Sequence, residues 1–344
     1  MFISRDGSIF KTYLSTGENL FSNKNFEMFT YSREAIFEIC NQNRISADDE
    51  VLLPDYLCST VIESILPFTK NIKFYSIDEN MNFDSKEIKT LISNRTKLIF
   101  FVDYFGVETH VNKELEIFLK NKNIIIVKDA AHSFLSLVKH DFKKEYDYDY
   151  LISSMYKNLP FQVGSIAIGK FDRKNRFINF SVFAKRSLVL LIKNILSLLG
   201  QNKYINKDME KMVITDNQYI NYGHGINLYE LYYFLLRHVN FDRIIFEKQK
   251  LVKEYNKIFF ENRVYKPLFS KTLIEDNVLQ AYPIKCNNKE QRDSLLALLK
   301  KESIDAYTWP TFHKMNCNER LWSNILLLPI DKKVLKIINR IVDV

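Results

Sequence analysis

Short apolar runs recur along the first half of the chain, separated by stretches with the polar spacing of helices. The runs are rich in Val, Ile and Phe, which is typical of buried strands in a parallel sheet. We predict strands at 51–53, 72–77, 97–102 and 124–127. The intervening stretches predict helices at about 33–41, after Ser59, after Asp84 and at about 112–120, with Ser59 and Asp84 as suitable N-caps. This alternation favours a doubly wound α/β sheet with right-handed crossovers.

The second half of the chain changes character. Strands are predicted at 150–153 and 165–168, around a loop that carries Lys157, and 227–260 is typical of one long helix or two joined helices. The remainder predicts a smaller α+β unit, with a strand at 278–284 and helices at 289–301 and 332–343. The 344 residues fit about two domains. We predict a large domain at 1–240 and a small C-terminal domain at 241–344.

Composition and charge narrow the class of protein. The chain is 47% hydrophobic and 26% charged, as in ordinary globular proteins. Its net charge of +8 favours anionic partners, but the lysines form no dense basic run, so we expect no nucleic-acid partner. The four cysteines are scattered without a C-x-x-C pair, and charge interrupts the N-terminus where a signal peptide has an apolar run. These features predict a cytoplasmic protein.

The longest apolar stretch, 187–199, is too short for a bilayer span of about 20 residues, and Lys193 interrupts it. An interfacial amphipathic helix is one interpretation, because Lys185 and Arg186 precede the stretch. A helix in the core or at a subunit contact is favoured, and no stable membrane insertion is expected.

Candidate chemistry lies between residues 124 and 169. Asp129 ends an apolar strand, and ligands of parallel sheets bind at the carboxyl ends of strands. Its carboxyl either anchors a cofactor or caps the following helix. Lys157 lies between two buried strands, either as an exposed loop lysine or as an amine held neutral for Schiff-base chemistry. Together, a carboxylate for a pyridine nitrogen and a lysine for an aldehyde indicate pyridoxal 5'-phosphate (PLP).

Several segments resemble the DegT/StrS family of sugar aminotransferases, which have fold type I of the PLP-dependent enzymes. The resemblance covers about residues 28–344, and its most specific part is DAAH followed by a serine-and-lysine element. The segments that carry it are VLLPDYLCST, KLIFFVDYFG, VKDAAHS, SSMYKNLP, INLYELYYFLL, DAYTWP and LLLPID. The family implies a three-layer fold, with a mostly parallel sheet in the large domain and a small C-terminal α+β domain.

The resemblance also implies roles for individual residues. Lys157 is the catalytic residue that holds the cofactor and moves a proton between the cofactor and substrate carbons. The cofactor-binding residues are Asp129 at the pyridine nitrogen, His132 beside the ring or its hydroxyl, and Ser154, Ser32 and Arg33 at the phosphate. The substrate-contacting residues are Tyr104, Trp309, His313 and Asn221, the last reaching the neighbouring subunit's site.

Other interpretations stay open for some of these residues. His132 also fits a structural histidine, Trp309 a packed turn, and the segment around Asn221 a plain loop. Two positions depart from the family pattern, because Ser32 replaces the usual glycine and Cys58 stands near the usual ring-stacking aromatic. Tyr56, Tyr104 and Phe105 are the candidates for stacking. His110 and His224 lack partners at metal-ligand spacing, so no metal is expected.

The resemblance implies a PLP-dependent aminotransferase in glycan or surface-polysaccharide biosynthesis. Its substrates are a keto-sugar linked to a nucleotide and an amino donor, with glutamate the expected donor, and a homodimer is expected. One alternative is a PLP-dependent dehydratase of a keto-sugar, although relatives that dehydrate typically replace the lysine with histidine. Another is a non-catalytic homologue that acts as a binding partner.

Overall fold

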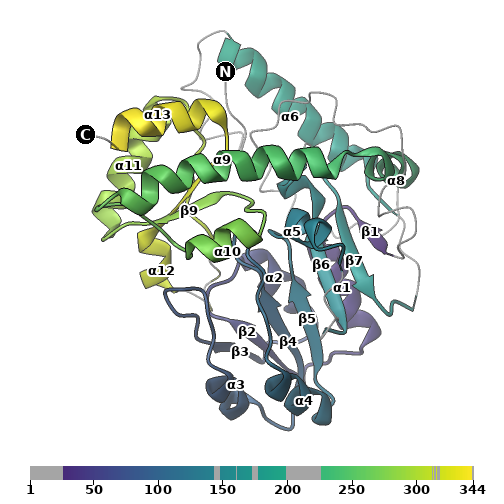
Figure 1. Cartoon of the computed structure of the whole chain (residues 1–344). Coiled ribbons are helices and arrows are strands. Elements are labelled where there is room, and N and C mark those ends of the chain that lie inside the picture. The colour runs from purple at the N-terminus through teal and green to yellow at the C-terminus, as the bar shows by residue number, and fades with distance from the viewer. Residues whose placement is uncertain are drawn as a thin grey trace.

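A computed structural model describes residues 26–142, 148–159, 161–172, 177–198, 226–311, 313, 315 and 318–342. In these ranges the chain forms a seven-stranded sheet of order β1-β7-β6-β5-β4-β2-β3 and a three-stranded sheet of order β10-β9-β8. Figure 1 shows the larger sheet below and the smaller sheet beside the C-terminal helices. This arrangement confirms the predicted α/β fold, with a mostly parallel large sheet and a smaller C-terminal α+β part.

Strands β2 to β6 of the larger sheet are parallel, whereas β7 runs antiparallel between β6 and β1. Its strands are β1 (Glu27–Phe29), β2 (Glu50–Pro54), β3 (Ile72–Tyr75), β4 (Thr96–Val102), β5 (Ile125–Asp129), β6 (Tyr150–Ser154) and β7 (Ser165–Gly169). The smaller sheet is antiparallel and consists of β8 (Lys266–Pro267), β9 (Tyr282–Lys285) and β10 (Ile325–Leu328). Strands β4, β5 and β6 are buried almost throughout, because helices cover both faces of the sheet.

The first helices alternate with the strands, as the periodicity predicts. They are α1 (Ser32–Gln42), α2 (Ser59–Ile65), α3 (Ser85–Leu91), α4 (Lys113–Asn121), α5 (Phe134–Lys139) and α6 (Phe180–Leu198). A single 3-10 turn, η2, spans Met155–Lys157. The later helices are α8 (Tyr229–His238), α9 (Phe241–Glu261), α10 (Lys271–Asp276), α11 (Lys289–Lys301), α12 (Glu319–Asn324) and α13 (Lys332–Val342).

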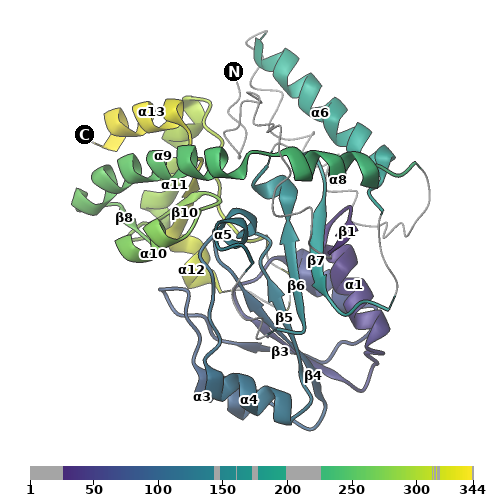
Figure 2. The same cartoon turned by 45° about the vertical axis from the view of Figure 1, so that its right-hand side comes forward.

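Helix α9 links the two parts of the molecule. It packs against α5 of the larger part and against α10, α13 and the small sheet. Figures 1 and 2 show it running from α8, above β7, to the small sheet. One apolar cluster is continuous from the strands of the larger sheet to β9 and β10. The predicted boundary at residues 240 and 241 stays a prediction, since α9 begins there and contacts both parts.

A close backbone contact holds the end of β4 against the segment before β9. Gly106 has a φ of +107°, and a Cβ there would lie 2.6 Å from Leu279 Cα and Val278 O, so only glycine fits without a shift. The Gln280 N–H donates to the Phe105 carbonyl at 2.8 Å, and the Ser136 hydroxyl donates to the Gly106 carbonyl at 2.6 Å. The loop after β4 is therefore fixed from two directions.

The structure corrects some local predictions. Cys58, not Ser59, is the N-cap of α2, whereas Asp84 caps α3 through the Lys86 N–H as predicted. The strand predicted at 278–284 begins at Tyr282, because 278–280 bonds to the loop after β4 instead. The segment 227–260 is two helices, divided at Val239 and Asn240. Strands β1 and β10 were not predicted from periodicity, since they are short.

The apolar stretch 187–199 lies mostly in α6, which extends away from both sheets in Figures 1 and 2. Leu188 is 56% exposed, so this side chain is not buried in the core, and the alternative of a subunit contact stays a prediction. The side chains of 190–198 and the whole of residue 199 are outside the described residues. No helix in the described ranges is both long and apolar enough to cross a bilayer.

Candidate active site

The ends of β5 and β6 and the starts of β7 and α1 meet at one edge of the larger sheet. Asp129, the last residue of β5, pairs with Ile152 of β6, two residues before Ser154. Ser165 opens β7 opposite Ser154, because β7 returns antiparallel to β6. On the other side of β7, Phe29 pairs with Ser165, and the chain continues from Phe29 into α1. Sheet register therefore brings residues from four parts of the sequence together.

Three serine hydroxyls form a cluster at this edge. Ser32 Oγ lies 2.6 Å from Ser154 Oγ and 2.8 Å from Ser165 Oγ, and the Ser165 hydroxyl donates to the Ser153 carbonyl at 2.9 Å. Ser32 is the first residue of α1, whose N-cap residue makes no side-chain capping bond. Hydroxyls beside the free N–H groups of a helix N-terminus fit a phosphate group. Ser32 and Ser154 thus lie together as the phosphate prediction requires.

Ser165 was missed by the sequence reasoning. It directly follows Gly164, whose φ of +117° turns the chain into β7. The signal in the sequence that could have identified Ser165 is the shortness of the segment between Lys157 and the next predicted strand. An antiparallel return places the start of the second strand beside the end of the first.

The Asp129 carboxyl is buried, with 8% of the residue exposed. Its Oδ1 accepts the Ala131 N–H at 3.0 Å. The alternative of a helix cap is wrong, because α5 begins at Phe134 with Ser133 as its N-cap residue. Burial raises the pKa of the carboxyl above its usual value, while the charge of Lys157 and the Ala131 N–H oppose this rise. A buried carboxyl of this kind is stabilised as an anion by a positively charged partner such as a pyridinium N–H.

Lys157 is the last residue of η2 and is half-buried. Its charge lowers the pKa of both the Asp129 carboxyl and the His132 imidazole, and η2 directly follows β6, the neighbour of the strand that ends at Asp129. The neighbouring Asn158 is 3% exposed and donates from Nδ2 to the His132 carbonyl at 3.4 Å. Its Oδ1 is buried and has no hydrogen-bond partner in the described part of the chain. An orphaned buried acceptor beside Lys157 fits a site that a polar ligand completes.

His132 is held as a neutral ring. Its Nδ1 accepts the Phe105 N–H at 3.3 Å, so the proton of the neutral imidazole lies on Nε2. Burial lowers the pKa of the ring well below its usual value, and the nearby charge of Lys157 lowers it further. The ring stacks on Phe105 with centroids 5.8 Å apart, and Trp309 meets it edge-on at 4.9 Å. His132 therefore presents a fixed Nε2–H donor.

The rings of Tyr56, Tyr104, Phe105, His132 and Trp309 form an aromatic cluster, in which Phe105 and Trp309 contact the His132 ring. Tyr104 is 2% exposed, and its hydroxyl donates to the Tyr56 carbonyl at 2.8 Å. Tyr56 and Phe105 are fully buried, whereas Trp309 is half-buried. Trp309 thus lies against His132. The Tyr104 hydroxyl is hydrogen-bonded within the protein. The stacking partner and the substrate role of Tyr104 stay predictions.

The remaining predicted residues are less tightly placed. Arg33 lies with its guanidinium 4.3 Å from the centre of the Tyr31 ring. His313 Nδ1 accepts the Met315 N–H at 3.3 Å. Asn221 lies outside the described residues. In the ranges that the structure covers, no group of three His, Cys, Asp or Glu side chains is placed to hold a metal ion.

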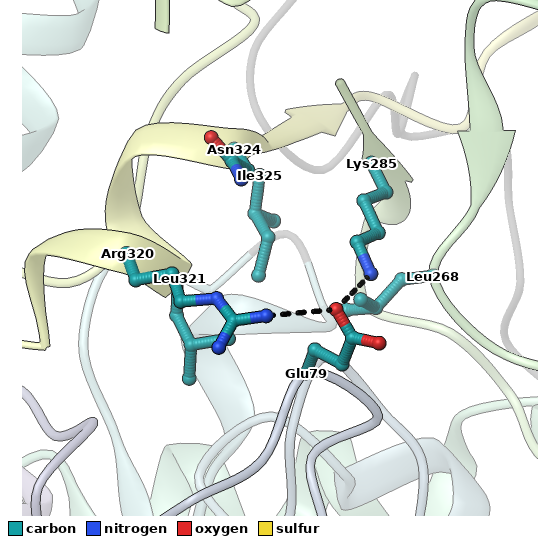
Figure 3. Close-up of a pocket in the computed structure, with 7 residues that line it drawn as sticks. All are labelled: Glu79, Leu268, Lys285, Arg320, Leu321, Asn324 and Ile325. Atoms are coloured by element: carbon teal, nitrogen blue, oxygen red, sulfur yellow. Dashed lines mark hydrogen bonds and ion pairs between the residues drawn. The ribbon is translucent and has the colours of Figure 1, made fainter. Parts of the chain in front are cut away.

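A small surface pocket between the larger sheet's loops and the small sheet holds none of these residues. Glu79 pairs there with Lys285 at 2.7 Å and with Arg320 at 3.4 Å, as Figure 3 shows. All three side chains are at least one-third exposed, so these ion pairs contribute little stability. The pocket is therefore a surface contact between the two parts of the chain.

Replacement of Glu34 by Gln is expected to remove a pH dependence of stability. Glu34 lies in the first turn of α1 and accepts the Thr30 N–H at 3.0 Å, and burial raises its pKa from 4.5 to about 7. A pKa raised by folding favours the protonated native state, so this stability is present below 4.5 and is lost as pH rises through about 7. The full loss corresponds to about 3 kcal/mol.

Urea unfolding at pH 5 and pH 8 measures this effect. Wild type should lose stability between the two pH values, whereas Glu34→Gln should be the more stable protein at pH 8, since Gln keeps the acceptor oxygen. Glu38→Gln, on the same helix, is the matched control and should behave like wild type. An equal pH dependence in Glu34→Gln and wild type would contradict the assignment.

The fold is that of fold type I PLP-dependent enzymes. Residues 35–144 match the model of the DegT/DnrJ/EryC1/StrS aminotransferase family, the family that the sequence motifs resemble. The match ends before Ser154 and Lys157, whose assignment depends on the geometry above. A comparison with curated proteins finds no match.

Solved structures share the fold over nearly the whole chain. Spr1654 from Streptococcus pneumoniae in its PMP-form, provisionally described as a sugar aminotransferase, is 17% identical, with a TM-score of 0.66 over 96% of this chain and 92% of that one. NtdA from Bacillus subtilis with bound PMP is 15% identical, with a TM-score of 0.64 over 96% and 78%. PseC from Helicobacter pylori is 14% identical, with a TM-score of 0.62 over 97% and 93%.

Proposed function

We propose that this protein is a PLP-dependent aminotransferase that moves an amino group, from glutamate, onto a keto carbon of a nucleotide-linked sugar. The observation that carries the proposal is the meeting of Asp129, Lys157 and the serine cluster (Ser32, Ser154 and Ser165) at one edge of the sheet. These groups supply an acid for a pyridine nitrogen, an amine for an aldehyde and donors for a phosphate.

The residues present fit the cofactor. When bound, PLP supplies an aldehyde carbon and a ring that withdraws electrons from the reacting carbon. Asp129 would hold the protonated ring nitrogen, and its burial strengthens that ion pair. The serine cluster and the N-terminus of α1 would hold the phosphate. His132 would donate its Nε2–H to the ring hydroxyl.

Lys157 would act on the substrate's proton. Its amine would bind the cofactor's aldehyde carbon while the site awaits an amino donor. Once released, the same amine would take a proton from the donor's carbon and return it at the cofactor carbon. Two observations support this role: the charge of Lys157 lowers the pKa of both Asp129 and His132, and η2 carries Lys157 directly after β6, the neighbour of the strand that ends at Asp129.

The substrate class is supported by likeness to related proteins. Spr1654 is described as a sugar aminotransferase, and PseC as an aminotransferase of pseudoaminic acid biosynthesis. The resemblance of the motifs adds the nucleotide link and glutamate, and the net charge of +8 suits an anionic substrate. A role in glycan or surface-polysaccharide assembly and a homodimer are proposed on the same resemblance, and the scattered cysteines favour a cytoplasmic location.

The two half-reactions can be followed separately by absorbance. Addition of glutamate to PLP-loaded protein should convert the visible absorbance of the lysine-bound cofactor to the near-ultraviolet absorbance of PMP. A panel of nucleotide-linked keto-sugars should then restore the visible band and yield an amino-sugar. A deoxygenated product would favour the dehydratase instead, and a wild-type protein that takes up no PLP would contradict the proposal and favour a non-catalytic binding partner.

A further inference from the structure

The loop after β4 makes a tight turn directly beside the His132 ring. Phe105 has a φ of +57° and Gly106 a φ of +107°, and the Val107 N–H closes the turn by donating to the Tyr104 carbonyl at 2.9 Å. A bulky residue such as Phe105 rarely adopts a positive φ, and residues held in this conformation cluster at functional sites. The turn therefore persists because surrounding contacts hold it.

This turn delivers one backbone donor to the histidine ring. The Phe105 N–H donates to His132 Nδ1 at 3.3 Å, and the two rings stack with an interplanar angle of 14°. A neutral imidazole carries its proton on the nitrogen that does not accept a hydrogen bond, so this contact keeps the proton on Nε2. The backbone conformation of Phe105 thus determines which nitrogen of His132 is the donor.

A buried serine hydroxyl holds the turn from the other side. Ser136 is fully buried, and its hydroxyl donates to the Gly106 carbonyl at 2.6 Å. The same oxygen accepts the Val278 N–H at 2.7 Å, whereas the Val278 carbonyl is a more distant acceptor at 3.3 Å. Ser136 lies on α5, four residues after His132. One short segment therefore carries both the ring and the hydroxyl that fixes the loop facing that ring.

Loss of this hydroxyl would leave two buried backbone groups without their partner, the Gly106 carbonyl and the Val278 N–H. Unsatisfied buried backbone groups are costly, so the turn would shift to find other partners for them. The remaining bond to the turn, from the Gln280 N–H to the Phe105 carbonyl at 2.8 Å, holds it at one point. Phe105 would then relax toward a negative φ, which rotates its N–H away from His132 Nδ1.

We propose that Ser136 is a positioning residue, which acts through the turn at Phe105 and Gly106 to keep His132 as the tautomer with its proton on Nε2. The inference rests on the proposed function, in which this Nε2–H meets the ring hydroxyl of the cofactor. Without Ser136, a fraction of the rings would carry the proton on Nδ1 and present a bare Nε2 to that hydroxyl. The effect of Ser136 on the site therefore passes through His132.

Nitrogen NMR of the imidazole rings reads the tautomer directly in the cofactor-free protein. A His132→Gln variant identifies the His132 signals among those of the six histidines. Wild type should show an unprotonated Nδ1 and a protonated Nε2, and in Ser136→Ala this preference should fall by about 10-fold, the usual effect of one hydrogen bond. Ser136→Thr keeps the hydroxyl and should resemble wild type. Ser136→Cys, which has a weak donor of similar size, should lie between them.

Ser64→Ala is the matched control, because Ser64 is also buried and its hydroxyl on α2 also donates to a carbonyl, that of Thr60 at 2.7 Å. Urea unfolding should show lower stability in both alanine variants, whereas only Ser136→Ala should change the tautomer.

Cofactor binding gives a second measurement. The Kd for PLP should rise by about 10-fold in Ser136→Ala, because the donor to the ring hydroxyl is partly lost. The Kd for the 3-deoxy analogue of PLP, which lacks that hydroxyl, should stay the same as in wild type.

An unchanged tautomer in Ser136→Ala, or equal weakening of PLP and its 3-deoxy analogue, would overturn the inference and show a purely structural role for Ser136. If Ser136→Ala does not fold, the same comparison is made with Ser136→Cys. Failure of wild type to bind PLP or to transfer an amino group would instead overturn the proposed function, since the tautomer is measured without cofactor.

Discussion

Replacement of Lys157 by alanine is expected to lower the rate of amino transfer by at least about 10²–10⁴-fold. The variant loses the amine whose charge lowers the pKa of both Asp129 and His132. It should still bind PLP, because the serine cluster and Asp129 remain. The visible absorbance of lysine-bound cofactor should be missing, and the absorbance of free PLP should replace it.

Borohydride treatment gives an independent measure of the same prediction. In PLP-loaded wild type it should fix the cofactor irreversibly on the peptide that contains Lys157, as mass spectrometry would show. Lys250→Ala, at an exposed lysine of α9, is the matched control and should keep both activity and labelling. Fixation on another lysine, or full activity of Lys157→Ala, would refute the assignment.

Replacement of Asp129 by asparagine is expected to lower activity by about 10²–10⁴-fold. The amide keeps the size of the side chain but removes the buried negative charge opposite the pyridine nitrogen. Removing one partner of a buried ion pair costs about 3–5 kcal/mol, and each 1.36 kcal/mol corresponds to tenfold in rate or affinity. The rate of the glutamate half-reaction and the Kd for PLP measure the loss.

The stability of the Asp129→Asn variant should not fall along with its activity. Burial raises the pKa of the Asp129 carboxyl in the cofactor-free protein. Its contribution to stability is therefore present at low pH and is lost as pH rises through the raised pKa. The cofactor-free variant should be at least as stable as wild type at pH 8, although it is nearly inactive. Asp48→Asn, at an exposed aspartate, should change neither property; destabilisation of Asp129→Asn at pH 8 would indicate a structural role instead.

Local periodicity predicted most of the larger sheet, because buried parallel strands and the helices between them each leave a pattern within a few residues. The same reasoning placed Asp129 at a strand end and Lys157 between two strands. The strand that ends at Asp129 and the strand that precedes Lys157 proved to be neighbours in the sheet. It missed β1 because a three-residue edge strand carries too short a pattern. It also placed a strand at 278–280, where bonding to the β4 loop is preferred.

The residues of the candidate site likewise fall into those that could be inferred from the sequence and those that could not. The residue types that hold a pyridine nitrogen and an aldehyde could be inferred from the sequence, since both occur in one segment of strand, loop and strand. Ser165, Asn158 and Ser136 could not, because their roles depend on which atoms lie beside them. Ser165 is a ligand candidate only through its 2.8 Å contact with Ser32, which is 133 residues away.

The sequence by itself thus determined the fold class and the two candidate groups, Asp129 and Lys157, because periodicity and residue chemistry are local properties. Only the tertiary structure decided which residues surround them. Antiparallel return of β7 brought the serine hydroxyls together, and packing of α6 onto the loop after Lys157 placed Arg186 over the Tyr31 ring. Long-range contacts of this kind are set by sheet register and helix packing, which no short stretch of sequence encodes.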